Sequence, residues 1–197
     1  QRSTDGYRLA IEPSDLDAWL FDEWVRTARL LATRGDHSGS GEVFEGALAM
    51  WRGSALADAS LTPGLVSEAL RLEELRISAS EDWLDVDLAR GRPGEVVARS
   101  EALIQANPFR EGLWAASMLG LYRCGRQADA LDAYQKVRHL LAEELGIEPG
   151  PRLRALESAI LRHDPALDQD AVDDVGTAPG ADRGPAIRHT PGRWVRS

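Results

Sequence analysis

The spacing of hydrophobic residues changes once along the chain, near residue 14. In residues 1–13, apolar and polar side chains alternate after Asp5-Gly6, a dipeptide typical of hairpin turns, so we expect a short β-strand there. Too few residues precede the turn to supply a full partner strand, and we expect the rest of that sheet upstream of Gln1. From Ser14 onward, apolar residues recur every three to four positions, which predicts helices.

Seven helices follow from this spacing and from the residues that begin and end helices. They cover residues 14–35, about 40–52, 62–91, 93–106, 107–125, a stretch ending at residue 146, and 151–163. Thr62-Pro63 and Asn107-Pro108 are typical helix starts, because a side-chain oxygen caps the first N–H groups and proline suits the first turn. Glycine favours the left-handed conformation that ends helices, and the glycines at predicted helix ends are Gly35, Gly91, Gly125 and Gly146. The apolar face predicted for the first helix carries Leu16, Leu20, Trp24, Leu30 and Leu31.

The helices repeat at a regular interval. The separation of Gly91 and Gly125 equals the period of tetratricopeptide repeats, about 34 residues. A tryptophan before the glycine and an aromatic residue after it recur at equal spacing around both Gly35 and Gly125, whereas the middle unit has Ser80 and Ser100 there. The residues at repeat-signature positions are Trp24, Gly35, Phe44, Gly91, Pro108, Trp114, Gly125, Ala130 and Tyr134. We predict an all-α fold, an antiparallel array of tetratricopeptide-like helix pairs, in which these residues pack in the seams between helices.

Composition and charge narrow the classes of function. Hydrophobic residues make up 43% of the 197 residues, which is enough for a core, and 32 acids against 23 bases give a net charge of −9. That balance opposes binding to phosphate backbones. The single cysteine, Cys124, excludes a disulfide framework and a cysteine zinc cage, and no apolar run is long enough to span a membrane. We expect a cytoplasmic protein with no cofactor and no metal.

Candidate catalytic and binding motifs do not assemble into a site, so we predict that the chain is not an enzyme. GDHSGSGE (35–42) lacks the Gly-Lys-Ser/Thr ending of phosphate-binding loops and carries two acids, so it is predicted to be a plain inter-helix loop. Asp85 and Asp87 are two residues apart on a helix, point in different directions and are expected on a solvated face. Cys124 has arginine neighbours but no adjacent histidine, and is interpreted as a helix-end residue.

The C-terminal residues differ in composition from the helical part. Residues 164–197 are rich in Ala, Asp, Gly, Pro and Arg, with six acids and no base in 164–182, then four arginines and no acid in 183–197. Such a segment buries too little apolar surface to offset the entropy of ordering. We therefore predict a disordered tail over 164–197.

Four stretches resemble a known family. They are LYRCGRQADALDAYQ (121–135), LAEELGIEPGPRLRALE (141–157), LEELRISASEDWLDVDLARGRPGEVV (72–97) and ALAMWRGSALAD (47–58). They are similar to the bacterial transcriptional activator domain of SARP-type antibiotic regulatory proteins. The resemblance implies that this domain covers residues 14–163. Two glycines within residues 35–44 fall where the family starts its second helix, so we expect that helix to start late.

The same resemblance places an OmpR-like winged-helix DNA-binding domain directly upstream. Its last hairpin ends in a GYRL strand in the family, and Gly6, Tyr7, Arg8 and Leu9 occupy that place here. Residues 1–13 are therefore expected to be the C-terminal hairpin remnant of a winged-helix domain. Promoter DNA would be bound only through that upstream domain.

The function that the resemblance implies is activation of genes for a secondary metabolite, such as an antibiotic. The helical module would contact RNA polymerase, through its sigma subunit, would pack on its own winged-helix domain, and would form a homodimer in the full-length protein. Two alternatives remain open at this point. One is a stand-alone tetratricopeptide scaffold that binds a peptide or partner protein, and the other is a helical repeat that senses a small molecule.

The net negative charge generates a first testable prediction. Residues 1–197 alone should not bind promoter DNA specifically, because specific binding needs clustered cations to contact phosphates. The measurement is an electrophoretic mobility shift at physiological salt. A shifted band that excess nonspecific DNA competes poorly would contradict the prediction.

Overall fold

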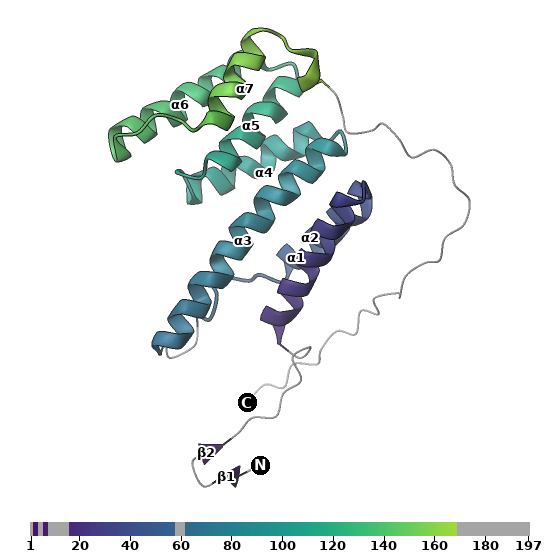
Figure 1. The fold of residues 1–197 in the computed structure, drawn as a ribbon, viewed down its shortest axis with the longest axis vertical. Helices are drawn as coiled ribbons and strands as arrows, with labels where there is room; N and C mark the ends of the chain where they lie inside the picture. The colour runs from purple at the N-terminus through teal and green to yellow at the C-terminus, as the bar shows by residue number, and fades with distance from the viewer. Residues whose placement is uncertain (1, 4–5, 8–15, 58–61, 169–197) are drawn as a thin grey trace, which may run out of the picture.

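The computed structural model describes residues 2–3, 6–7, 16–57 and 62–168, and in them it shows an array of helices (Figure 1). The helices are α1 (Asp17–Thr33), α2 (His37–Ala49), α3 (Pro63–Ala89), α4 (Pro93–Ala106), α5 (Glu111–Arg123), α6 (Gln127–Leu145), α7 (Pro151–Leu161) and the short 3-10 helix η2 (Pro165–Leu167). Each α-helix contacts the next α-helix along the chain, and the long α3 contacts α1 and α2 on one side and α4 and α5 on the other. The predicted all-α array of helix pairs is confirmed.

Two short strands precede the helices. Strands β1 (Arg2–Ser3) and β2 (Gly6–Tyr7) pair antiparallel, with Ser3 opposite Gly6. Gly6, which belongs both to the predicted turn dipeptide and to the expected GYRL strand, lies with Tyr7 in β2. Arg8, Leu9 and the remainder of the predicted strand fall outside the described residues.

The predicted helix-ending glycines adopt the left-handed backbone conformation. Their φ angles lie between 67° and 79°. After three of them, the next N–H donates to a carbonyl five residues earlier, which ends the helix in a Schellman turn. These three bonds are Asp36 N to Leu31 O at 3.0 Å, Arg92 N to Asp87 O at 2.9 Å, and Arg126 N to Leu121 O at 2.9 Å. The equivalent turns therefore start α2, α4 and α6 in the same register.

Three helix starts differ from the prediction. Helix α1 begins at Asp17, not at residue 14. Helix α2 begins at His37, not near residue 40, because the Asp36 carboxylate accepts a hydrogen bond from Gly39 N at 2.8 Å and caps the first turn. Helix α5 begins at Glu111, not at Asn107-Pro108. Asn107 ends α4 instead, where its backbone N–H donates to Leu103 O at 2.9 Å.

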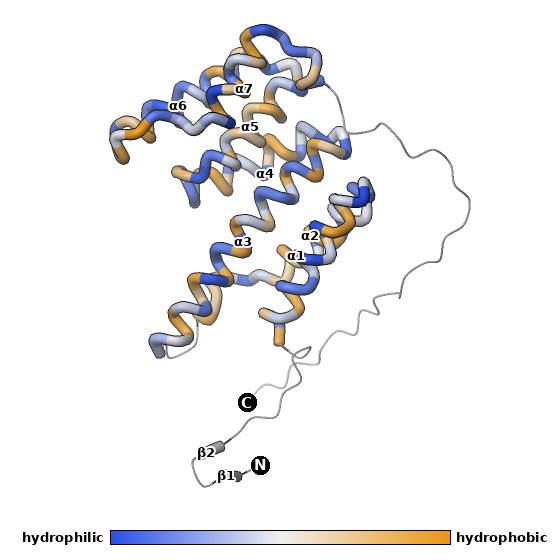
Figure 2. Tube along the Cα trace, viewed as in Figure 1, coloured by the Kyte–Doolittle hydropathy of each residue, from blue (hydrophilic) through white to orange (hydrophobic). Residues whose placement is uncertain are grey.

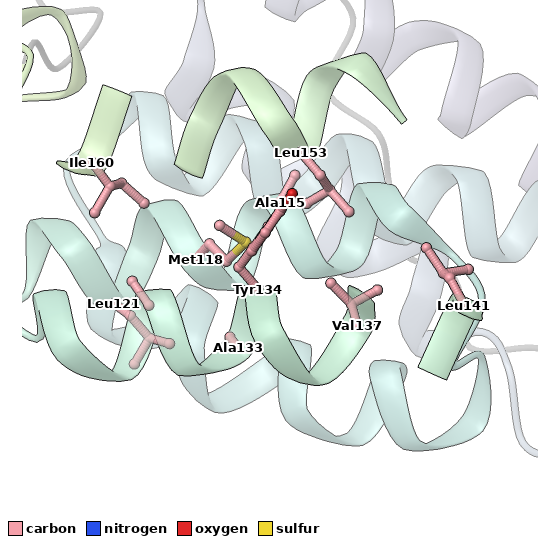
Figure 3. Close-up of a cluster of buried hydrophobic side chains, with 10 residues drawn as sticks. Ala115, Met118, Leu121, Ala133, Tyr134, Val137, Leu141, Leu153 and Ile160 are labelled. Carbon is pink, nitrogen blue, oxygen red and sulfur yellow. The ribbon is translucent and has the colours of Figure 1, made fainter. Parts of the chain in front are cut away.

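Three clusters of buried side chains run along the array, and Figure 2 shows the hydrophobic positions recurring along each helix. The N-terminal cluster joins α1, α2 and α3 through Phe21, Val25, Ala28, Phe44, Ala47, Ala79 and Val86. The middle cluster joins α3, α4 and α5 through Leu84, Leu88, Val96, Leu113 and Ala116. The C-terminal cluster joins α5, α6 and α7 and is drawn in Figure 3; its members include Met118, Tyr134, Val137, Leu141, Leu153 and Ile160. Each cluster uses neighbouring helices only, as expected for a repeat array.

The buried face of α1 and the end of the ordered chain need correction. Phe21, Val25 and Ala28 carry the core contacts of α1, whereas Leu16 and Leu30 are about half exposed.

The predicted start of the tail, at residue 164, lies too early in the chain. Leu167 packs against the C-terminal cluster, and its carbonyl accepts a hydrogen bond from Arg123 Nε at 2.7 Å. Residues 169–197 lie outside the described residues.

The glycine turns lead to a stability prediction. Gly125 has a φ of +74°, and a side chain at that conformation costs about 1–2 kcal/mol. Gly125→Ala should therefore lower the free energy of unfolding by about that amount, measured by urea denaturation. Gly94→Ala is the matched control, because a Cβ there meets open space and the φ is ordinary. Equal stability of the two variants would contradict the role given to the turn.

A second stability prediction concerns Trp114. Its indole Nε1 donates to Pro108 O at 2.8 Å, and its ring packs against the C-terminal cluster while remaining partly exposed. Trp114→Ala should lower the free energy of unfolding toward the lower end of roughly 3–5 kcal/mol. Trp19 is 42% exposed, so Trp19→Ala should change stability by no more than about 0.5 kcal/mol. Thermal melts of the two variants make the comparison, and an unchanged melting temperature for Trp114→Ala would refute the packing role.

Candidate functional site

The repeat-signature residues lie between helices rather than around one site. Phe44, Ala130 and Tyr134 are buried. Trp24 is partly buried beside α2, where a Cβ added at Gly46 would lie 2.7 Å from Trp24 Cζ3. The structure thus places these side chains where α1 meets α2 and where α5 meets α6, and their predicted role remains one of packing.

Residues 35–42 form a turn and the first turn of α2, not the predicted loop. The Asp36 carboxylate accepts a hydrogen bond from Gly39 N and so places a negative charge at the start of α2, where a phosphate would otherwise bind. Ser40 is buried, and its hydroxyl donates to Ala28 O at 2.8 Å. Gly41 lies under the Arg90 guanidinium, which a Cβ would overlap. Ser40 and Gly41 therefore let α2 approach its neighbours closely and do not cradle a ligand.

Asp87 was expected on a solvated face, and that prediction is wrong. The Asp87 carboxylate is fully buried at the end of α3 and pairs with Arg90 at 3.1 Å and with Arg99 of α4. The Arg99 guanidinium carbon also lies 4.0 Å from the Trp83 ring centroid. Burial raises the pKa of the Asp87 carboxyl, while the charges of Arg99 and Arg90 act in the opposite direction. Through its contacts with Asp87 and Trp83, Arg99 holds α4 against α3.

Asp85, two residues earlier, points to another side of α3. Its side chain is about half exposed and pairs with Arg152 of α7 at 3.3 Å. The pair of carboxylates is therefore split between two faces, as their spacing predicted, and provides no acid–base couple.

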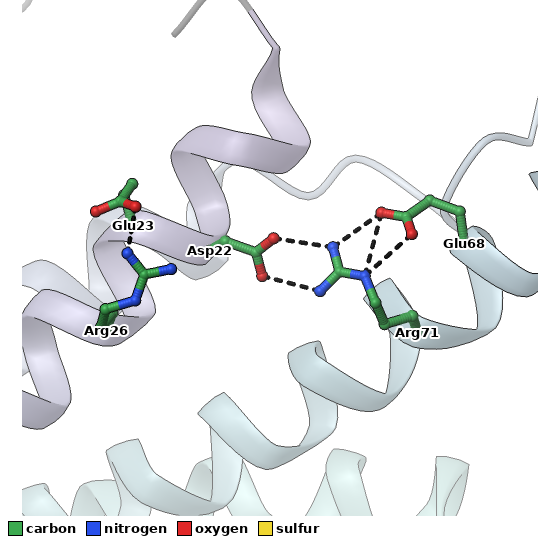
Figure 4. A network of polar contacts seen from close by, with 5 residues as sticks. All are labelled: Asp22, Glu23, Arg26, Glu68 and Arg71. Atoms are coloured by element: carbon green, nitrogen blue, oxygen red, sulfur yellow. Dashed lines mark hydrogen bonds and ion pairs between the residues drawn. The ribbon is translucent and has the colours of Figure 1, made fainter. Parts of the chain in front are cut away.

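Further ion pairs connect α1 with α3. Arg71 donates to both carboxylate oxygens of Asp22, at 3.0 and 2.9 Å, and also to Glu68 (Figure 4). Closer to the C-terminal ends of the same two helices, Arg29 Nε of α1 donates to Asp82 of α3 at 2.6 Å. Arg71 is exposed, and such bridges contribute little stability each, on the order of 0.2–1 kcal/mol. They fix how α1 lies along α3.

Hollows lie along the described part of the array, and three of them exceed 400 Å³. The largest of these three, of about 630 Å³, lies between the start of α1 and the segment after α2, with Phe21, Trp51 and Leu72 in its lining. A second, of about 450 Å³, lies between α1, α2 and α3 beside Arg29 and Asp82. A third, of about 460 Å³, lies between α4, α5 and α6. These concave surfaces suit protein segments or small ligands.

An exposed apolar stripe lies on the first half of α3. Leu65, Val66 and Leu70 are 36%, 40% and 68% exposed. Their spacing puts Val66 and Leu70 on one side of the helix. Exposed apolar side chains gathered on one element are a feature of protein contact surfaces.

The described residues hold no group of three or more metal-ligating side chains of the kind that could bind an ion. Cys124 is exposed at the end of α5. No helix within the described ranges is both long and apolar enough to cross a membrane. Nothing in this part of the chain forms a catalytic constellation.

Sequence reasoning missed the buried cluster around Asp87, although a signal for it existed. Asp87 stands one repeat period before Leu121, which is buried at the end of α5. An acid at a position that the next repeat fills with leucine indicates a buried carboxylate with partners.

Comparison with known proteins identifies the family. Residues 16–161 match the family model described as the bacterial transcriptional activator domain. The regulatory protein DnrI of Streptomyces peucetius is 37% identical over 85% of this chain and 62% of its own length. The regulatory protein AfsR of Streptomyces griseus is 40% identical over 84% of this chain and 17% of its own.

A solved structure agrees with these relatives. Mycobacterium tuberculosis EmbR, in complex with a low-affinity phosphopeptide, superposes with a TM-score of 0.77 at 33% identity, over 84% of this chain and 45% of EmbR. The chain thus spans less than two thirds of the length of each of these relatives. The chain belongs to the bacterial transcriptional activator domain family, whose members here are SARP-type transcriptional regulators.

Proposed function

We propose that this chain is the protein-interaction and activation module of a pathway-specific activator of secondary-metabolite biosynthesis genes. The observation that carries the proposal is the match of residues 16–161 to an activator-domain model, together with relatives that are regulatory proteins of Streptomyces. The array adds grooves and an exposed apolar stripe, which are features of a binding protein.

The proposed mechanism is recruitment. A winged-helix domain, of which residues 1–13 are the remnant, reads the promoter, and the helical module of residues 14–163 contacts the sigma subunit of RNA polymerase. Tethering raises the effective concentration of polymerase at the promoter and requires no chemistry from the module. Self-association to a homodimer would double the contacts, in line with promoter half-sites arranged for a dimer.

We assign the polymerase contact to the α3 stripe of Leu65, Val66 and Leu70. Leu70 is more exposed than any other large apolar side chain of the described residues, at 68%. Covering an exposed leucine removes apolar surface from water at about 25 cal/mol per Å². Contacts of this kind dominate the cores of protein interfaces.

A tethering experiment tests the proposal. Residues 1–197 are fused to an unrelated DNA-binding domain whose operator stands upstream of a weak reporter promoter in a bacterium. The fusion should raise reporter transcription several-fold, and Leu70→Ser should remove most of the increase. Arg154→Ser is the matched control, since Arg154 is exposed on α7, away from the stripe.

The outcome is read together with fusion abundance and operator occupancy. If the intact fusion accumulates and occupies its operator but leaves transcription at the basal level, the activation proposal fails. If activation occurs and Leu70→Ser retains it, the module still activates but the α3 stripe is not the contact.

A further inference from the structure

The groove between α4, α5 and α6 is lined by small and aliphatic side chains at its deepest part. The buried residues of its lining, Ser117 and Leu121 of α5 and Ala133 of α6, form its floor. Trp114 of α5 and Val97 and Ile104 of α4 also line it. Its volume of about 460 Å³ is within the range of sites that hold a large side chain or a small ligand. Each floor position is filled by a small or aliphatic residue, so the space above it is unfilled by this repeat.

The preceding repeat shows what fills the corresponding space. Trp83 stands one repeat period before Ser117, and Arg99 stands the same interval before Ala133. There, the Arg99 guanidinium stacks on the Trp83 ring at 4.0 Å and pairs with the buried Asp87. Where the middle repeat places an indole and an arginine against each other, the last repeat has a hydroxyl and a methyl group. The α4–α6 groove is therefore shaped for an aromatic side chain with an arginine beside it.

We propose that the α4–α6 groove binds residues 193–196 of the same chain, Arg-Trp-Val-Arg, with the Trp194 indole over Ser117 and Ala133. Trp194 is the one tryptophan of the chain's six that lies outside the described residues. Arginine stands next to it at Arg193 and two residues after it at Arg196. The tail thus carries the same pair of side-chain types that the middle repeat uses.

Charge favours this occupant. Residues 183–197 contain four arginines and no acid, and all 32 acids of the chain precede them. In the groove lining, Arg126 is already paired with Asp129 at 2.7 Å. Glu101 and Asp132 also line the groove, and neither forms an ion pair within the described parts of the chain. They offer carboxylates to the arginines of the segment, while Lys136 of α6 also lines the groove and repels those arginines.

The segment is attached close to the groove. The Leu167 carbonyl accepts a hydrogen bond from Arg123, three residues before Arg126 in the lining. A linker of about 25 residues spans on the order of 28 Å as a random coil, a distance comparable with the length of one of these helices. A tethered segment experiences an effective concentration in the millimolar range, so weak contacts suffice for binding.

Cys124 allows the proposal to be tested in the full chain without adding a cysteine. It is the only cysteine, is exposed, and lies two residues from Arg126 at one end of the groove. A nitroxide attached to Cys124 broadens nearby proton signals, and the indole N–H of Trp194 is identified in the ¹⁵N spectrum by its loss in Trp194→Phe. We expect the spin label to reduce the Trp194 indole signal by at least half relative to the reduced, diamagnetic label.

Variants in the groove and in the tail separate docking from chance approach. Ala133→Arg copies Arg99 into the groove and should restore the Trp194 signal, because it fills the space and repels the segment. Arg193→Glu with Arg196→Glu should restore it as well, and lies outside the helical domain. Arg183→Glu with Arg188→Glu makes the same charge change in the same tail and should leave the broadening in place.

Three results would overturn the proposal. One is a Trp194 signal that the label leaves unchanged. Another is equal broadening in the unchanged chain, in Ala133→Arg and in the Arg193→Glu, Arg196→Glu variant. The last is broadening that disappears on dilution, which would mean that the tail reaches another copy rather than its own groove.

Discussion

Every helix in this array buries its apolar face only against its neighbours along the chain, and this constraint governs the rest of the structure. The N-terminal, middle and C-terminal clusters follow one another along the chain, and each is built from three neighbouring helices. A small error in the register of one pair would therefore displace the face offered to the next. The register is set at the turns, where Gly35, Gly91 and Gly125 close α1, α3 and α5 with the same pair of backbone bonds.

Features that depend on local chemistry could be predicted from the sequence. The left-handed glycines follow from the steric freedom of glycine alone. The seven helices follow from apolar residues that recur every three to four positions, a pattern that is visible within each segment by itself. The start of α2 could not be predicted in the same way. Glycine disfavours a helix interior, but here Gly41 and Gly46 admit Arg90 and Trp24, and this close approach appears only once three helices are assembled.

Asp87 illustrates a second limit. Residue type and helical spacing favour a solvated carboxylate, since an unpaired buried charge is strongly unfavourable. The partners that reverse this preference come from the next turn, Arg90, and from the next helix, Arg99, and neither is visible in the periodicity of α3. Such a buried pair adds little net stability over apolar packing. Its effect is on geometry, because Arg99 also covers Trp83 and so fixes α4 against α3.

Differences between repeats, rather than the repeat itself, create the surfaces available for binding. Signature positions such as Phe44 and Tyr134 are buried in both outer units and hold helices together. Positions outside the signature differ between the units of this chain. Where the middle unit uses Trp83 and Arg99, the last unit has Ser117 and Ala133, and a groove results without any change in the path of the helices. A repeat array can thus present a groove where one unit carries two smaller side chains, while the helices of that unit remain packed through their shared cluster.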